Sequence, residues 1–214
     1  FRCAEQIRND VDYHNLPVTV VSVGSGLGYG NLGSIYNSVS SITYEVIISK
    51  NYKELKKSDI IILPGIGSAR VFAKSLVRSG LNNFLLDHIK DNKLLIAICL
   101  GFQYLFSYTP EDGGVEGLSI FPQKVIRIDN ARYNSSRTGW YTVNNMKSFG
   151  FRKNNCFFYF NHSYAIKPYN NYFQQYGLSS NFLAWIKKKN VIGLQFHPEK
   201  SQKNGKNILK FLLG

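Results

Sequence analysis

The sequence predicts an α/β fold in which a mostly parallel central sheet is flanked by helices, with an antiparallel extension in the second half. In the first half, short β-branched runs alternate with segments whose apolar residues recur every three or four positions. This alternation is typical of βαβ units and therefore of a parallel sheet. In the second half, short strands follow one another through turns with little helix between them, which favours antiparallel additions to the same sheet.

Four strands and three helices are expected in the first half. The strand runs are almost continuously apolar, as expected where helices cover both faces of a sheet. Asn31 is interpreted as the N-cap of the first helix, and Pro64-Gly65 as the stop of the third strand. We expect strands at 18–24, 44–48, 59–63 and 94–98, and helices at 32–39, 68–77 and 82–91.

The second half ends in an amphipathic helix at 204–213, whose Ile208, Leu209, Phe211 and Leu212 are expected to face the core. Three lysines at 187–189 fall between two expected strands and are interpreted as a solvated hairpin turn. The strands of this half are expected at 124–128, 141–143, 157–161, 182–187 and 191–196.

Length and composition fit one globular domain, since the chain has 214 residues, of which 44% are hydrophobic and 18% charged. The chain opens without Met, and its first residues are polar. We therefore treat residues 1–16 as an N-terminal tail of uncertain status and 17–214 as the domain. No apolar run approaches the roughly 20 residues that cross a bilayer, and the start lacks the apolar region of a signal peptide. A cytoplasmic protein without a membrane segment is expected.

The chain is strongly basic, with 26 Lys and Arg against 13 Asp and Glu and a formal net charge of +13. This raises nucleic acid, anionic lipid and phosphorylated molecules as partners, and charge alone chooses none of them. The cysteines Cys3, Cys99 and Cys156 are odd in number and widely spaced. They suggest neither a disulfide framework nor a metal site, so a reducing compartment fits best.

Cys99 is the first candidate for chemistry. It follows a buried strand and precedes a helical segment, with the small residues Ala97 and Gly101 two positions away on either side. Small neighbours are what a sharp strand-to-helix elbow requires. A cysteine at a helix N-terminus also tends toward its reactive thiolate form. The alternative is a buried core cysteine.

His197 and Glu199 form a second candidate pair. Residues two apart in extended chain point the same way, and Pro198 favours extended backbone at His197. A carboxylate beside an imidazole orients it, and the imidazole can take a thiol proton. The alternative is a surface turn that contains a histidine by chance. The pair indicates a catalytic site only because the same chain also has the elbow at Cys99.

Two glycine-rich stretches follow strands. The turn at 63–68 presents backbone N–H groups that suit an oxyanion hole, a phosphate loop or a simple turn. It lacks the Lys-Ser/Thr ending of a P-loop, which argues against nucleotide binding. The stretch from Gly24 to Gly30 does not have the spacing of a dinucleotide fingerprint when read from Gly24, although Gly28, Gly30 and Gly33 allow other registers. A connecting loop is the favoured interpretation.

Four motifs together resemble the class I glutamine amidotransferases, which have a flavodoxin-like fold. They are L-P-G-I-G at 63–67, I-C-L-G-F-Q at 98–103, F-Y-F-N-H-S-Y at 158–164 and Q-F-H-P-E-K-S-Q at 195–202. The last two are most similar to the HisH branch of that family, the glutaminase subunits of imidazole glycerol phosphate synthase. The resemblance extends from Val18 to the C-terminus.

The resemblance implies a glutaminase with Cys99 as nucleophile, His197 as base and then acid, and Glu199 as the residue that orients His197. It also implies that L-glutamine is the substrate and that no cofactor or metal is needed. By the same resemblance, the substrate is bound by the oxyanion strand Gly65, Ile66 and Gly67, by Gln103, and by His162, Ser163 and Tyr164.

The resemblance further implies a heterodimer in which ammonia passes to a HisF-type cyclase subunit for histidine biosynthesis. Where that branch has His-Met-Gly-Trp-Asn, near the subunit interface, this chain has Arg137-Thr138-Gly139-Trp140-Tyr141. The departure leaves a second partner open, a sugar amidotransferase of surface polysaccharide biosynthesis. A non-catalytic scaffold or basic nucleic-acid-binding protein is the alternative of another class, although nucleic acid is not the expected partner.

Overall fold

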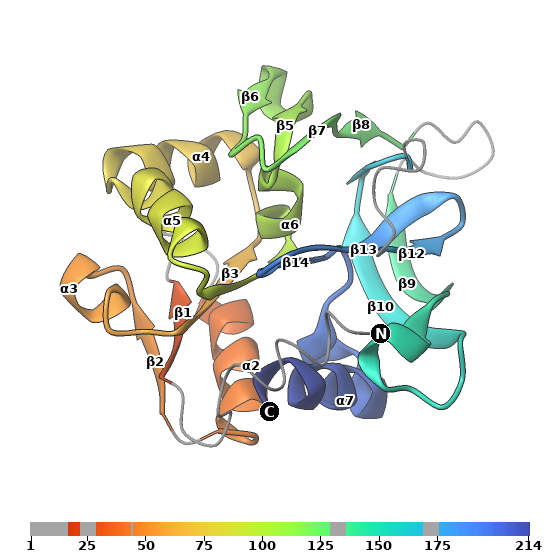
Figure 1. Ribbon diagram of the computed structural model, residues 1–214. Helices are drawn as coiled ribbons and strands as arrows, with labels where there is room; N and C mark the ends of the chain where they lie inside the picture. The colour runs from red at the N-terminus through yellow and green to blue at the C-terminus, as the bar shows by residue number, and fades with distance from the viewer. Residues whose placement is uncertain (1–16, 22–28, 44, 129–135, 169–175) are drawn as a thin grey trace.

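The computed structural model describes residues 17–21, 29–43, 45–128, 136–168 and 176–214 (Figure 1). The expected tail at 1–16, the end of the first expected strand and the glycine-rich stretch up to Gly28 lie outside the described residues. No described helix combines the length and the apolar character that crossing a bilayer would need.

A seven-stranded sheet forms the centre of the molecule, as the sequence predicts. Its order is β12-β13-β14-β4-β3-β1-β2. The five strands from β14 to β2 are parallel, whereas β13 and β12 add to one edge in antiparallel pairing. The strands are β1 (Val18–Val21), β2 (Val46–Ser49), β3 (Ile60–Gly65), β4 (Leu94–Cys99), β12 (Tyr176–Ser179), β13 (Phe182–Lys188) and β14 (Val191–Leu194).

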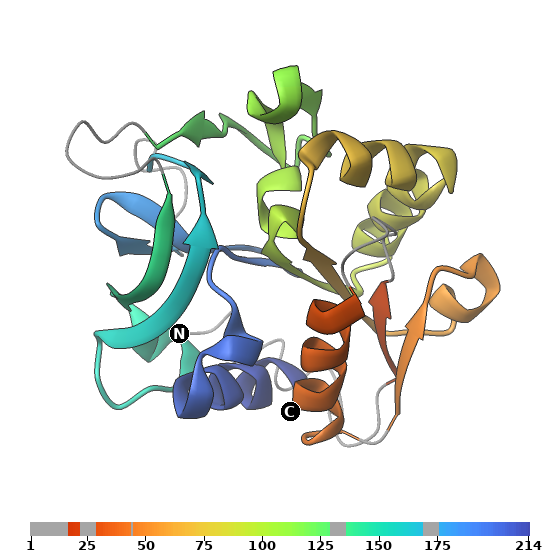
Figure 2. The same ribbon diagram turned by 180° about the vertical axis from the view of Figure 1, so that it is seen from behind.

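Helices cover both faces of this sheet (Figures 1 and 2). On one face lie α2 (Tyr29–Ser40) and α7 (Gln202–Leu213), and on the other lie α4 (Ala69–Arg78) and α5 (Leu81–Lys90). Two helices are short: α3 (Tyr52–Leu55) lies between β2 and β3 in the chain, and α6 (Leu100–Tyr104) follows β4. Of these helices, α3 is not among those expected from the sequence.

The strands feed two separate cores because their side chains alternate. In β4, Ile96 and Ile98 belong to the core under α2 and α7, while Leu95 and Ala97 belong to the core under α4 and α5. Because the side chains on both faces of the strand are buried in a core, the strand is apolar throughout. This explains why the first-half strands are recognisable as continuous runs.

Small sheets built from the second half stand apart from the central one. Within the described residues, the strands β9 (Arg137–Val143) and β10 (Cys156–His162) pair only with each other, in an antiparallel ribbon. Of the strands expected in this half, those at 182–187 (β13) and 191–196 (β14) belong to the central sheet, and β13 has the antiparallel pairing that the sequence predicts. β12 adds a further antiparallel strand that was not expected. The remaining short strands are β5 (Phe106–Thr109), β6 (Val115–Glu116), β7 (Phe121–Lys124), β8 (Ile126–Arg127) and β11 (Tyr164–Ala165).

Several predicted boundaries are wrong by a few residues. Asn31 lies inside α2 rather than capping it, and β3 continues through Gly65. The strand expected at 124–128 divides into β7, which pairs with β5, and β8, which pairs with β11. In α7, Ile208, Leu209 and Leu212 are buried as predicted, whereas Phe211 is only partly buried. Short 3-10 turns lie at η1 (Glu111–Gly113), η2 (Met146–Phe149) and η3 (Pro198–Lys200).

Candidate active site

Cys99 occupies a sharp turn between β4 and α6. Its backbone has φ +56° and ψ −109°, a conformation that residues other than glycine rarely adopt. α6 begins at the next residue, so the cysteine stands at the start of a helix. The strand ends at Cys99 and the helix begins at Leu100, which is the strand-to-helix elbow that the sequence predicts.

The turn after β3 packs directly against this elbow. Gly65 and Cys99 are register partners in neighbouring parallel strands. A Cβ atom on Gly65 would lie 2.5 Å from the backbone nitrogen of Gly101, so only glycine fits there. Ile66 is half-buried, and Gly67 is exposed with φ +85°. Gly65 of the expected oxyanion strand therefore lies beside the nucleophile, and Ile66 and Gly67 follow it directly in the chain.

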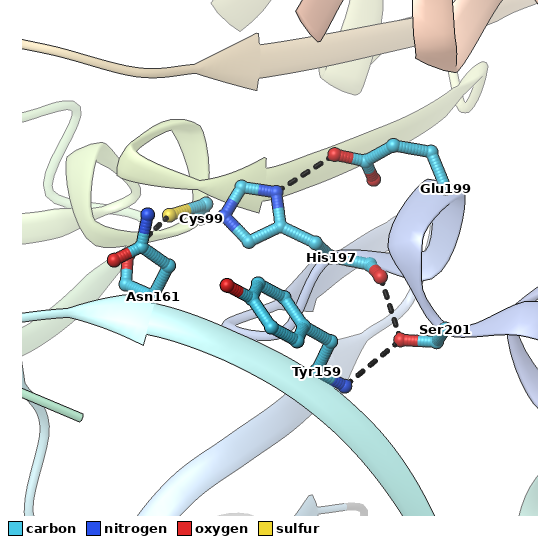
Figure 3. Close-up of polar contacts among 6 residues, drawn as sticks. All are labelled: Cys99, Tyr159, Asn161, His197, Glu199 and Ser201. Carbon is cyan, nitrogen blue, oxygen red and sulfur yellow. Dashed lines mark hydrogen bonds and ion pairs between the residues drawn. The ribbon is translucent and has the colours of Figure 1, made fainter. Parts of the chain in front are cut away.

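His197 reaches the same edge of the sheet from β14, the other neighbour of β4. Its backbone is extended, with φ −96° and ψ 96°, as Pro198 favours. Its N–H donates to the carbonyl of Tyr159 at 2.9 Å. The Ser201 hydroxyl donates to the His197 carbonyl at 2.6 Å and accepts the Tyr159 N–H at 3.0 Å (Figure 3). These bonds tie the backbone of His197 to the ribbon.

Glu199 orients the imidazole. Nδ1 of His197 lies 2.7 Å from Oε1 of Glu199, and both side chains are buried. Figure 3 shows the ring between the Cys99 sulfur and the Glu199 carboxylate, with its second nitrogen toward the sulfur. A carboxylate at Nδ1 keeps a proton on that nitrogen and leaves the other nitrogen to exchange a proton with the thiol.

The pKa of His197 is raised to about 10. Burial acts to lower it, but the negative charges of a Cys99 thiolate and of the Glu199 carboxylate outweigh burial. The His197 imidazole is consequently favoured in its charged form, in which it can give a proton to a leaving group.

The ribbon covers the nucleophile from the other side. The Cys99 thiol contacts the backbone carbonyl of Asn161 at 3.8 Å. The Asn161 side chain in turn accepts a hydrogen bond from the Thr138 hydroxyl at 3.0 Å across the ribbon. Cys99 is only 6% exposed, and β10 is one of the elements that lie against it.

Gln103, a predicted substrate contact, is bound within the protein. Its Nε2 donates to the Tyr164 carbonyl at 2.7 Å and to Oε1 of Gln195 at 3.1 Å. Gln195 has no exposed surface; it opens the motif at 195–202, but no role was predicted for it. A signal was available, because Gln195 is a polar residue directly after an apolar strand and two residues before His197.

His162 also contacts the Tyr164 carbonyl. Its Nδ1 lies 2.8 Å from the Tyr164 carbonyl oxygen, whereas its Nε2 has no partner among the described residues. Burial lowers the pKa of His162 to about 4, helped by the nearby charges of Arg137 and His197. Ser163 and Tyr164 are half-exposed between β10 and β11. Gln103 and His162 thus fix the backbone of the segment at 163–164 from two sides.

Arg137 is buried rather than presented at the surface. It is 7% exposed, donates to the Ser179 carbonyl at 2.9 Å, and lies 4.1 Å from the centre of the Tyr141 ring. Its neighbour Trp140 is 44% exposed. In the segment that departs from the HisH pattern, Arg137 is therefore a buried structural residue, whereas Thr138 and Trp140 are exposed.

Comparisons with known proteins agree on one family. The profile of the family described as glutamine amidotransferase class-I matches residues 28–213. The imidazole glycerol phosphate synthase subunit HisH of Pyrococcus furiosus is 34% identical over 198 residues, which cover 86% of this chain and 93% of the relative. HisH of Chlorobaculum tepidum is 30% identical over 189 residues, with coverage of 86% and 94%.

Solved structures show the same fold. The structure of PurLQS from Thermotoga maritima superposes with a TM-score of 0.71 at 15% identity, over 92% of this chain and 98% of that chain. By its sequence profile and its curated relatives, this chain belongs to the class I glutamine amidotransferase family, and within it to the HisH branch.

Proposed function

We propose that this protein is the glutaminase subunit of an imidazole glycerol phosphate synthase. It hydrolyses L-glutamine to glutamate and ammonia, and the ammonia passes to a HisF-type cyclase subunit in histidine biosynthesis. The observation that carries the proposal is the placement of the His197 imidazole between the Cys99 thiol and Glu199, with Nδ1 2.7 Å from Oε1. The HisH relatives support the pathway, and they give no support to the sugar amidotransferase or scaffold alternatives.

In the first half of the reaction, the Cys99 thiolate attacks the side-chain amide carbon of glutamine. The carbonyl oxygen becomes an oxyanion, which backbone N–H groups of Gly65, Ile66 and Gly67 can stabilise. When the tetrahedral intermediate collapses, the C–N bond breaks and the His197 imidazolium gives its proton to the leaving nitrogen. Ammonia leaves, and a γ-glutamyl thioester remains on Cys99.

In the second half, neutral His197 takes a proton from water while the water oxygen attacks the thioester carbon. Collapse of the second tetrahedral intermediate breaks the C–S bond, which releases glutamate and restores the thiolate beside the imidazolium. The Glu199 carboxylate stabilises the imidazolium each time it forms. Free ammonia is mostly protonated at neutral pH and is then no nucleophile, so direct transfer to a partner subunit is chemically useful.

The segment 163–164 is tied both to the elbow helix and to the ribbon. Gln103 lies on the elbow helix and His162 on the ribbon, and both bind the Tyr164 carbonyl. We therefore assign Gln103 and His162 a role in positioning Ser163 and Tyr164, which line the glutamine pocket in this proposal.

The test is glutamate release from glutamine by the purified chain, alone and with the HisF-type cyclase and its ribonucleotide ligand. We expect stimulation by the cyclase and complete loss in Cys99→Ala. Cys156→Ala is the matched control, because Cys156 is also a buried free thiol but lies at the far end of β10. Turnover in Cys99→Ala would refute the catalytic assignment, and activity that ignores the cyclase would refute the pathway.

A further inference from the structure

A hairpin that follows the elbow helix reaches back to the start of α4. It consists of β5, the 3-10 turn η1 and β6, and it lies beside the first turn of α4 (Figure 1). In the chain, η1 comes shortly after α6, whereas α4 begins directly after the oxyanion strand and Ser68. The contact therefore joins the segment after the nucleophile to the segment after the oxyanion strand.

Asp112 of η1 makes this contact with both its side chain and its backbone. Its Oδ2 accepts hydrogen bonds from the Ser68 hydroxyl at 2.5 Å and from the Arg70 backbone N–H at 3.2 Å. Its backbone carbonyl accepts from Nε of Arg70 at 2.9 Å and also from Nη2 of the same guanidinium. The hydrogen bond from Ser68 is the main reason that the pKa of Asp112 lies below its ordinary value. We name these three residues the η1–α4 clamp: Ser68, Arg70 and Asp112.

The backbone of η1 is bent into an unusual conformation at the clamp. Asp112 has φ +54° and ψ +31°, in the left-handed region that residues other than glycine rarely adopt. Gly113 and Gly114 follow with φ +81° and +100°. Such backbone persists only where surrounding contacts enforce it, and it is commonest near functional sites. The hydrogen bonds of the clamp are contacts of this kind.

The clamp exceeds what the capping of α4 requires. The Ser68 hydroxyl already accepts the Val71 N–H at 3.2 Å, which is an ordinary N-cap hydrogen bond. The cap of α3 is of the same kind, since Asn51 accepts the Lys53 N–H at 3.0 Å. In α4, however, the cap residue is also bound by a carboxylate that lies 44 positions further along the chain. Ser68 is therefore fixed against another part of the protein.

We propose that Asp112 is a positioning residue for glutamine hydrolysis and acts through Ser68 on the oxyanion strand. The first end of this strand is fixed at Gly65, which lies against Gly101. The other end is Gly67, which directly precedes the clamped Ser68. With both ends held, the backbone N–H groups between them keep the direction that a developing oxyanion needs. The inference rests on the proposed function.

An oxyanion forms only when the sulfur attacks the amide carbon, so the clamp should act on the rate of the chemical step. Interactions made only in the transition state change kcat and kcat/KM alike and leave KM nearly unchanged. Removing one oxyanion donor lowers kcat by about 100- to 1000-fold. Loss of the clamp leaves the donors present but less well directed, so a smaller loss of kcat is expected.

Four variants of the full-length chain separate positioning from capping. Asp112→Gly tolerates φ +54° and keeps the carbonyl that binds Arg70, but it lacks the carboxylate. Asp112→Asn is the rescue variant, because asparagine tolerates left-handed backbone and its Oδ1 can accept from Ser68. Ser68→Ala removes the other partner of the bond. Asn51→Ala is the matched control, since it deletes an N-cap hydrogen bond in α3 and leaves the clamp intact.

Glutamate release is measured in the condition, with or without the cyclase, that gives the wild type its highest turnover. We expect Asp112→Gly and Ser68→Ala to lower kcat by about tenfold while KM stays within about twofold. Asp112→Asn and Asn51→Ala should keep kcat within about twofold of wild type. The midpoints of urea unfolding should shift by similar amounts in Ser68→Ala and Asn51→Ala, so that lost stability does not account for the difference in kcat.

The outcomes distinguish the inference from the proposed function. Wild-type kcat in Asp112→Gly, or an equal loss of kcat in Asn51→Ala, would overturn the inference and leave the proposed function standing. Failure of Asp112→Asn to restore kcat would also overturn it, because the hydrogen bond to Ser68 would then not be the cause. A wild-type chain without turnover in any condition would overturn both.

Alkylation of Cys99 by iodoacetamide tests whether the nucleophile itself is undisturbed. This reaction displaces iodide from a saturated carbon and forms no oxyanion, but it needs the same thiolate. The rate at Cys99, followed by mass spectrometry of its peptide, should stay within about twofold of wild type in Asp112→Gly. A loss of alkylation rate as large as the loss of kcat would overturn the inference, because the variant would then have disturbed the elbow rather than the oxyanion strand.

Discussion

Gly101 lies directly against the backbone carbonyl of Leu63, so that a Cβ atom on Gly101 would come within 2.1 Å of that oxygen. The contact joins the first turn of the elbow helix α6 to β3 in the middle of the sheet. Because Leu63 is a buried strand residue with neighbours on both sides, its carbonyl has no room to retreat. The close approach holds the nucleophile's helix against the strand that leads to Gly65.

Gly101→Ala should therefore destabilise the protein by about 2 kcal/mol or more and abolish glutaminase activity, because overpacking at a rigid site forces backbone shifts. Urea unfolding followed by circular dichroism measures the loss. Gly33→Ala is the control: Gly33 lies within α2, and a Cβ atom added there would meet nothing within 4 Å. That variant should gain about 0.5–1 kcal/mol. Similar stabilities for the two variants would contradict the packing argument.

Glu199→Gln should lower glutamine turnover by about 100-fold or more, because the amide cannot stabilise the imidazolium. The Glu199 charge also helps to raise the pKa of His197 to about 10. The alkaline limb of the pH–rate profile should consequently move to lower pH in this variant. Glu116→Gln, at an exposed position in β6, serves as the control. An unchanged alkaline limb in Glu199→Gln would show that the limb does not report His197.

The neutral His162 makes stability depend on pH. Its pKa is about 4 in the folded protein against 6.5 for an ordinary histidine, so between these values the unfolded chain binds a proton that the folded protein does not. The contribution of His162 is complete above pH 6.5 and is lost as pH falls toward 4, by about 3 kcal/mol.

His162→Gln removes this contribution, and unfolding free energies of both proteins from about pH 7 to 4 provide the measurement. His88 also has its pKa lowered by burial and acts in the same direction, so the difference between the two proteins isolates His162. Parallel stability curves over this window would disprove the assignment.

Gln195→Met should raise the KM for glutamine several-fold with a smaller change in kcat. The substitution keeps the side-chain volume but removes the acceptor that holds Gln103 at 3.1 Å. Gln103→Met should act through the same network, so the double variant should be no worse than the more severe single variant. Additive losses would indicate that the two glutamines act independently.

The sequence predicted those parts of the site that consist of residues close together in the chain. The elbow at Cys99 and the spacing of His197 and Glu199 are local patterns, and the structure places these residues together. The role of Gln195 was hidden because it depends on α6, β11 and the end of β14 meeting in space. No local pattern encodes such a meeting.

In the fold, too, local features could be predicted from the sequence and long-range pairing could not. Runs such as Leu94–Cys99 are apolar because two cores flank them, and this was visible in the sequence. The separation of β9 and β10 from the central sheet was not visible, because the choice of a strand's partner is a long-range property. Arg137 shows the same limit: its burial depends on Ser179, which the sequence places far away.

The neighbouring positions of β4 and β14 bear on how the enzyme is made. β4 carries Cys99 and β14 leads to His197, and the two strands lie side by side although most of the second half of the chain separates them. During synthesis on the ribosome, the nucleophile therefore emerges long before its base. A nascent chain can complete much of the parallel sheet while remaining unable to release ammonia, and hydrolysis begins only after the final strand of the parallel set has been inserted next to β4.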